Sequence, residues 1–193
     1  RELAAMSTWM RRPALWIFVL LLAGCANLLV KPGPQTVDGL TLNTPVAWTD
    51  YGLRGERLWT RDGVLLNALR IYTDIRPGEH VFRERQRNSK REEGARYRAA
   101  SSAVEIQEVI LEALRADGLA NVAAEDLRPA TLAGRSGFRF RLRFDSQAGL
   151  HYQGLVLGEG ADDTLSFLIF TAPAGHYYEH NQDTVEAIYS SLR

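Results

Sequence analysis

The clearest pattern along the chain is a strict alternation of apolar and polar residues in "GFRFRLRF", residues 137–144. Successive side chains of a strand point to opposite faces, so this segment predicts a strand with one buried face. The buried face would hold Phe138, Phe140, Leu142 and Phe144, and the outer face Arg139, Arg141 and Arg143.

Two further apolar segments, 150–160 and 164–173, follow this strand and are separated from each other by turn-forming residues. Three consecutive strands with short connections predict an antiparallel meander. The last of them, "TLSFLIFTAP", is apolar at both odd and even positions. We therefore expect it to be a central strand that is covered on both faces.

Apolar residues spaced three and four apart predict two helices. The first helix begins at Ser102, which has the spacing of a capping box to Glu105. It ends at Gly118, which tolerates a left-handed backbone. Its apolar face comprises Ile106, Val109, Ile110, Ala113 and Leu114. The second helix closes the chain and presents Tyr178, Val185, Ile188, Tyr189 and Leu192.

The region around the first helix is less regular. Asp62-Gly63 lies between two apolar-rich runs in segment 56–72, which predicts a hairpin with a two-residue turn. Segment 76–98 is rich in charged residues and shows no persistent period, so we expect a surface excursion. Residues 119–128 read as a link into the second group of strands.

This order of elements predicts an α+β fold, an antiparallel sheet of about five to six strands packed with two main helices. We assign residues 45–193 to this single domain. Residues 25–44 contain Pro32, Gly33, Pro34 and Gly39, which favour an extended tether without packing contacts.

The N-terminal residues have the pattern of a secretion signal. Arg11 and Arg12 precede the apolar run "PALWIFVLLLA", residues 13–23, and small residues follow at a cut site. "LAGC", residues 22–25, resembles the lipobox of bacterial lipoproteins. That resemblance implies acylation of Cys25, cleavage before it, and a division into extension and signal peptide (1–24) and lipidated tether (25–44).

Two alternatives to the lipobox are an uncleaved membrane anchor and an ordinary core cysteine. The apolar run is short for a membrane span, which needs about 20 residues. In Gram-negative lipoproteins, a residue other than Asp after the cysteine, here Ala26, resembles the pattern of outer-membrane sorting. The expected location is thus the cell envelope, on the periplasmic face of the outer membrane.

The order of strands and helices, together with the ending "SFLIFTAPAGHYYEHNQDTVEAIYSSLR", resembles the PsbP-like fold, including the DcrB-like envelope lipoproteins. More narrowly, the chain is similar to an uncharacterised group of proteobacterial lipoproteins. Members of this fold mostly act as accessory or binding proteins. The resemblance therefore implies a PsbP-like sandwich and carries no active site over.

The composition bears on one class of partner, nucleic acids. Lys plus Arg and Asp plus Glu both number 23, so the formal net charge is zero and does not indicate nucleic acid. The chain has a single cysteine. No motif implies a cofactor, because the glycines of 154–160 are followed by neither the lysine nor the helix of a phosphate-binding loop.

Candidate chemistry is sparse. His176, Glu179 and His180 can share one helical face and are candidate metal ligands, although their order differs from the zinc-protease motif. The alternative is a polar first turn of the last helix. Ser136 in "GRSG" lacks the spacing of a nucleophile elbow, so we interpret it as part of a tight turn.

The arginine stripe Arg139, Arg141 and Arg143 is the best candidate binding surface, since guanidinium groups bind carboxylates and phosphates with a planar fork of donors. Its partners would be an envelope protein, an anionic lipid or a glycan. Alternatively, the stripe pairs with acidic neighbours, or its side chains cover the sheet.

The leading functional hypothesis is a lipid-anchored, non-catalytic envelope protein with a binding or accessory role. One alternative is a hydrolase or metal-binding enzyme that uses the His176, Glu179 and His180 region. Another is a carrier of a lipid or other hydrophobic ligand, which requires an apolar cavity between the sheet and a helix.

Overall fold

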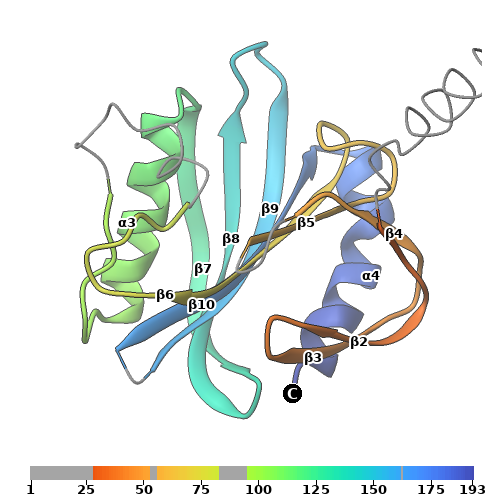
Figure 1. Cartoon of the computed structure of the whole chain (residues 1–193). Coiled ribbons are helices and arrows are strands. Elements are labelled where there is room, and N and C mark those ends of the chain that lie inside the picture. Colours follow the sequence, from red (N-terminus) through yellow and green to blue (C-terminus); the bar gives the residue numbers. More distant parts are fainter. Residues whose placement is uncertain (1–27, 53–55, 83–94, 162) are drawn as a thin grey trace, which may run out of the picture.

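A computed structural model of the chain describes residues 28–52, 56–82, 95–161 and 163–193. Helices α3 (Ala103–Ala116) and α4 (His176–Ser191) lie on opposite sides of an eight-stranded antiparallel sheet (Figure 1). The sheet has the strand order β1-β4-β5-β6-β10-β9-β8-β7, and a separate two-stranded sheet pairs β2 with β3.

The strands have the following bounds: β1 Leu28–Val30, β2 Gly33–Val37, β3 Leu40–Thr44, β4 Trp48–Asp50, β5 Glu56–Thr60, β6 Ala68–Ile75, β7 Ala120–Leu132, β8 Arg135–Asp145, β9 His151–Ala161 and β10 Thr164–Pro173. The predicted meander is confirmed, because β8, β9 and β10 pair in succession and antiparallel. β10 lies between β9 and β6 and is buried on both faces, as its uninterrupted apolar sequence indicates.

The predicted α+β class is confirmed, but five to six strands is too few. The sheet gains the short strands β1 and β4 at one edge and the 13-residue β7 at the other. The predicted link at 119–128 is instead largely part of β7. Within this strand the pairing with β8 shifts register twice, and Asn121 and Asp126 adopt positive φ, so the segment lacks the regular alternation that indicates a strand.

Helix α3 forms as predicted, and its cap is the expected capping box. The Ser102 backbone N–H donates to Glu105 Oε2 at 2.7 Å, and the Glu105 N–H donates to Ser102 Oγ at 3.3 Å. These bonds satisfy donors at the helix start that have no partner within the helix. Gly118, with φ of 82°, follows the last turn, as the sequence indicates.

Replacing Ser102 with alanine is expected to lower the free energy of unfolding by about 1 kcal/mol, because the N-cap side chain is lost. The hydrogen bonds from the Ser102 backbone and then its hydroxyl lower the pKa of Glu105. A lowered folded-state pKa contributes stability at neutral pH that is lost as pH falls through that pKa. Urea unfolding at pH 7 and pH 3 should therefore show a smaller difference between variant and wild type at pH 3.

The matched control is Ser190→Ala, an exposed serine in α4 for which we expect a change within about 0.5 kcal/mol. If both alanine variants unfold at the same urea concentration as wild type, the capping box contributes nothing to stability.

The segment predicted as a tether is folded from residue 28 onward, so the prediction of an unpacked linker is wrong for 28–44. Val37, Leu40 and Leu42 are buried in one cluster with residues of α4. The backbones of Thr41 and Arg193 exchange two hydrogen bonds, of 3.0 and 2.8 Å, which join β3 to the C-terminus. The prolines and glycines of this segment did not indicate strands. β2 and β3 pair with each other, and residues at the C-terminal end of the chain contact them.

The hairpin turns also differ from the prediction in one place. β5 and β6 pair as an antiparallel hairpin, but residues 61–67 connect them, so Asp62-Gly63 is not a two-residue turn. Two-residue turns with both φ values positive occur instead at Asp38-Gly39 and Ala133-Gly134. The Asn67 carboxamide explains the longer connection, because its Oδ1 accepts from the Thr60 hydroxyl and the Arg61 N–H at 2.9 and 2.8 Å.

The predicted surface excursion 76–98 is only partly described, since residues 83–94 lie outside the described ranges. Its described flanks are not purely superficial. Val81, Phe82, Ala95 and Tyr97 are all buried in the cluster that α3 covers.

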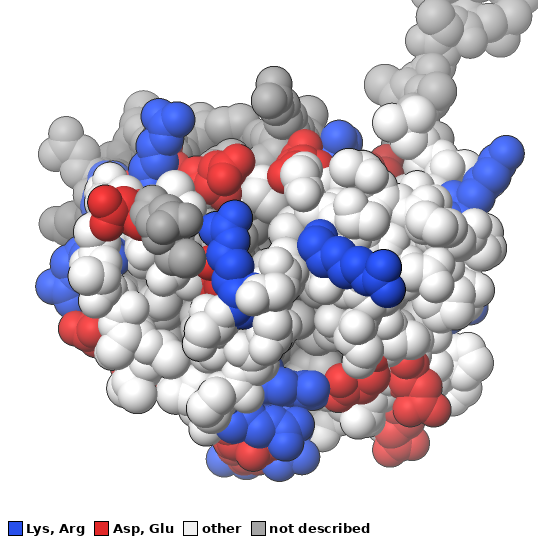
Figure 2. Space-filling model, turned by 90° about the horizontal axis from the view of Figure 1, so that it is seen from below, with Lys and Arg blue, Asp and Glu red and all other residues white. Residues whose placement is uncertain are grey.

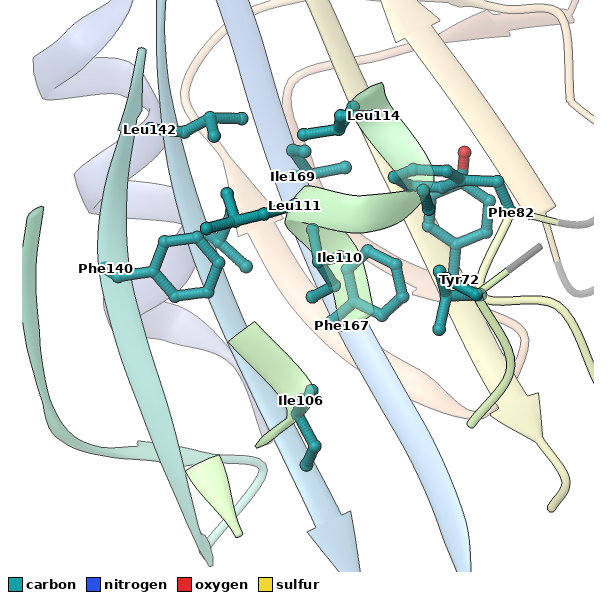
Figure 3. Packing of buried hydrophobic residues seen from close by; sticks show 14 of the residues in the cluster. Tyr72, Phe82, Ile106, Ile110, Leu111, Leu114, Phe140, Leu142, Phe167 and Ile169 are labelled. Carbon is teal, nitrogen blue, oxygen red and sulfur yellow. The ribbon is translucent and has the colours of Figure 1, made fainter. Parts of the chain in front are cut away.

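The apolar side chains form two clusters, one on each face of the sheet. The α3 cluster contains the inward residues of β8 together with Ile106, Ile110 and Phe167 (Figure 3). The α4 cluster contains Trp48, Trp59, Leu168, Phe170 and the apolar face of α4. Within the described part of the chain, no helix is both long and apolar enough to cross a membrane.

Candidate functional site

The three stripe arginines project from β8 toward the face that α4 covers, opposite the buried phenylalanines. Arg139 Nη2 contacts Glu186 Oε1 of α4 at 2.6 Å, and both side chains are partly shielded. Arg143 Nε lies 3.2 Å from Glu125 Oε1 of β7. Two of the three arginines therefore pair within the molecule.

Arg141 differs from its two neighbours. Glu125 is directly opposite it in the β7–β8 register, yet the Glu125 carboxylate contacts Arg143. No carboxylate of the described residues forms an ion pair with Arg141, and its side chain is exposed. Arg141 thus retains its guanidinium donors for solvent or for an external anion.

A groove of about 420 Å³ borders Arg141, between the outer face of β8 and β9 and the first turns of α4. Its polar lining side chains are Glu125, Arg141, Arg143, Gln153, Tyr178, Glu179 and Gln182. Two carboxamides, a phenol and a guanidinium together can donate several hydrogen bonds to one bound group. The groove therefore combines these donors with the carboxylates of Glu125 and Glu179, an arrangement suited to binding a polar group.

Arg141 affects the pKa of Tyr178, which also lines this groove. Burial raises the pKa of Tyr178, Glu186 raises it further, and Arg141 and Arg139 oppose the rise. Tyr178 therefore keeps its phenolic proton at neutral pH and stays a donor beside the arginine.

The face of the molecule seen in Figure 2 carries no broad surface of one charge. In the view of Figure 2, basic and acidic side chains are interspersed and large areas carry neither. A binding role for arginine therefore depends on local geometry around a particular side chain rather than on a broad basic field.

The His176, Glu179 and His180 region lies in the first turn of α4, and all three side chains are exposed. The two imidazole rings stack with centroids 5.9 Å apart. Among the described residues, no group of three or more His, Cys, Asp or Glu side chains is arranged to hold a metal ion.

Cys25 and Ser136 are the other residues that the sequence singles out. Cys25 lies outside the described residues. Ser136 is an exposed residue at the start of β8, next to the turn at Ala133-Gly134. Gln153, Tyr178 and Gln182 were not predicted as groove residues, because nothing in the local sequence indicates that β9 and α4 meet β8 at this point.

No protein-family model matches the chain, and no curated protein matches it in sequence. Cyanobacterial PsbP (CyanoP) from Synechocystis sp. PCC 6803 is similar in structure, with a TM-score of 0.56 at 12% identity, covering 89% of this chain and 94% of CyanoP. The Ran-binding protein Mog1p of Saccharomyces cerevisiae has a TM-score of 0.49 at 10% identity, covering 86% of this chain and 94% of Mog1p.

A third similar structure, from Bacteroides thetaiotaomicron VPI-5482, has a TM-score of 0.46 at 12% identity and covers 85% of this chain. Our chain spans about half of that protein, since 48% of its length is covered. The likeness to CyanoP confirms the expected PsbP-like fold. The lipobox remains a prediction from the sequence.

Proposed function

We propose that this protein is a lipid-anchored accessory protein of the cell envelope that binds an acidic segment of an envelope protein through the Arg141 groove. The anchor is Cys25, and the location is the periplasmic face of the outer membrane. The function is non-catalytic binding, which agrees with a groove of hydrogen-bond donors on a PsbP-like domain.

The proposal rests on a difference in ion pairing between Arg141 and the other two arginines of the stripe. Arg139 and Arg143 each contact a carboxylate of this chain, whereas Arg141 has none among the described residues and borders the groove. A carboxylate entering the groove would meet Arg141, Tyr178 and the amides of Gln153 and Gln182, and it would have to approach from the side away from the carboxylates of Glu125 and Glu179, which line the same groove. A charge-assisted contact of this kind is about twice as strong as a neutral hydrogen bond.

The interaction is tested by placing a photo-crosslinking residue at Gln182, an exposed lining residue, in the full chain expressed in its own membrane. A discrete protein crosslink is expected. Arg141→Gln should reduce its yield about tenfold, because the charge-assisted bond is lost. Arg115→Gln, on α3 on the opposite side of the sheet, is the matched control and should leave the yield unchanged.

A crosslink that persists at full yield in the Arg141→Gln variant would contradict the role of Arg141. A crosslinked product that is a glycan or a lipid would contradict the proposal that the partner is a protein. Thermal unfolding of each variant establishes that the domain remains folded.

A further inference from the structure

A second cavity lies on the other side of the sheet, where the C-terminal end of α3 passes over β6 and β10. Its volume is about 240 Å³. It is lined by Val64, Leu65, Arg70, Tyr72, Phe82, Leu114, Asp117, Leu119, Phe144, Ser146, Tyr152, Ile169 and Thr171. Most of these side chains are apolar, so the cavity has the composition of a small-molecule site.

The apolar wall is built from elements far apart in the sequence. Tyr72, Phe82, Leu114 and Ile169 converge between α3 and the sheet (Figure 3). At the rim, the Tyr152 hydroxyl donates to the Leu65 carbonyl at 2.7 Å and joins the 61–67 connection to β9. Leu65 is 73% exposed, so an occupant of the cavity would also cover rim apolar surface that now meets water.

Arg70 is the unexpected residue in this lining. It lies on β6 between Ala68 and Tyr72, whose side chains share its face and are both fully buried. Directly opposite on β10 is Ile169, which belongs to the α3 cluster. A guanidinium at a core-facing position is rare unless it has a partner, because removing the charge from water is costly.

That partner is not found within the described part of the chain, where no carboxylate forms an ion pair with Arg70. Asp117 also lines the cavity, but it is an exposed residue at the C-terminal end of α3. The positive charge of Arg70 instead stands at the edge of an apolar wall. Thr171, on the same face of the neighbouring strand, and Ser146 add hydroxyl groups to the lining.

We infer that this cavity binds a small amphipathic anion, a carboxylate with a medium-length hydrocarbon chain. The carboxylate pairs with Arg70, and the chain lies along Tyr72, Leu114 and Ile169. The volume exceeds that of an apolar cavity of about 150 Å³ that holds benzene, and it is below the roughly 300 Å³ at the low end of drug-sized sites. This site is separate from the Arg141 groove and does not depend on it.

The test is titration of the full chain with sodium octanoate, with binding measured by isothermal titration calorimetry and by NMR shifts of the lining residues. Octan-1-ol, which has a chain of the same length and no charge, is the comparison. Wild type should bind octanoate at least about tenfold more tightly than octan-1-ol, because only octanoate forms the charge-assisted pair.

Two variants locate the site. Arg70→Gln should remove the preference for octanoate and weaken its binding about tenfold, while leaving octan-1-ol binding unchanged. Leu119→Trp, at a half-buried lining position, should fill the cavity and abolish binding of both probes. Arg141→Gln is the matched control and should bind octanoate as wild type does, which separates this test from that of the groove.

The inference is overturned if wild type binds neither probe, if it binds both equally, or if Arg70→Gln keeps the wild-type preference. The comparison of the two probes on wild type needs no substitution, so the outcome is decisive even if a variant fails to fold.

Discussion

Replacing Phe167 with alanine is expected to lower the free energy of unfolding by about 4 kcal/mol, through loss of buried apolar surface and formation of a cavity. Phe167 is fully buried on the central strand β10. Its ring stacks on Tyr72 with centroids 4.8 Å apart and meets the edge of Phe82 at 6.1 Å. Phe167 belongs to the α3 cluster, which packs on this face of the sheet (Figure 3).

The measurement is urea unfolding followed by circular dichroism, and a fall of about 10 °C in Tm should accompany it. Phe167→Leu retains most of the volume and should cost less than about 1.5 kcal/mol. Leu150→Ala removes a side chain that is 54% exposed and should change stability by less than about 0.5 kcal/mol. A loss at Phe167→Ala no larger than that at Leu150→Ala would show that β10 does not occupy the centre of the core.

Replacing Cys25 with alanine is expected to abolish acylation completely and to leave the uncleaved precursor. Cys25 is the chain's only cysteine, so no other thiol can accept the lipid that the lipobox resemblance implies. Each buried methylene contributes about 0.8 kcal/mol to membrane attachment, and stable anchoring takes more than one acyl chain. Metabolic labelling with an alkyne fatty acid and membrane fractionation measure both consequences.

Ala26→Ser, which changes the next residue and keeps the thiol, is the control and should be labelled and cleaved like wild type. Labelling that survives in the Cys25→Ala variant, or wild type that carries no label, would contradict the assignment of Cys25 as the lipid attachment site. Neither result bears on Arg70 or Arg141, because those sites belong to the folded domain.

The strongest local patterns predicted their elements correctly. The alternation over 137–144 indicates a half-buried strand, and all four of its apolar residues are buried. Ser102 and Glu105 begin α3 as the capping-box spacing predicts. In both cases neighbours within a few residues determine the conformation, which is why one short segment contains the whole signal.

The missed elements depend on contacts between distant residues. β3 is held by the C-terminus through Thr41 and Arg193, and β7 keeps its pairing with β8 despite two register shifts. The local sequence of β3 does not indicate its contact with the C-terminus, and the local sequence of β7 does not indicate its pairing with β8. Pro34, in the neighbouring strand β2, and the positive-φ residue Asp126, in β7, are residues typical of connections, although both lie within strands.

The sequence by itself determined the α+β class, the meander and the outward direction of Arg139, Arg141 and Arg143, because period and capping are local properties. Only the tertiary structure decided that Glu186 and Glu125 pair with two of these arginines while Arg141 faces the groove. It also placed Arg70 at an apolar cavity. Whether a charged side chain has a partner depends on residues that the fold brings together across the sheet. The spacing of residues along the chain does not give the distance between those side chains.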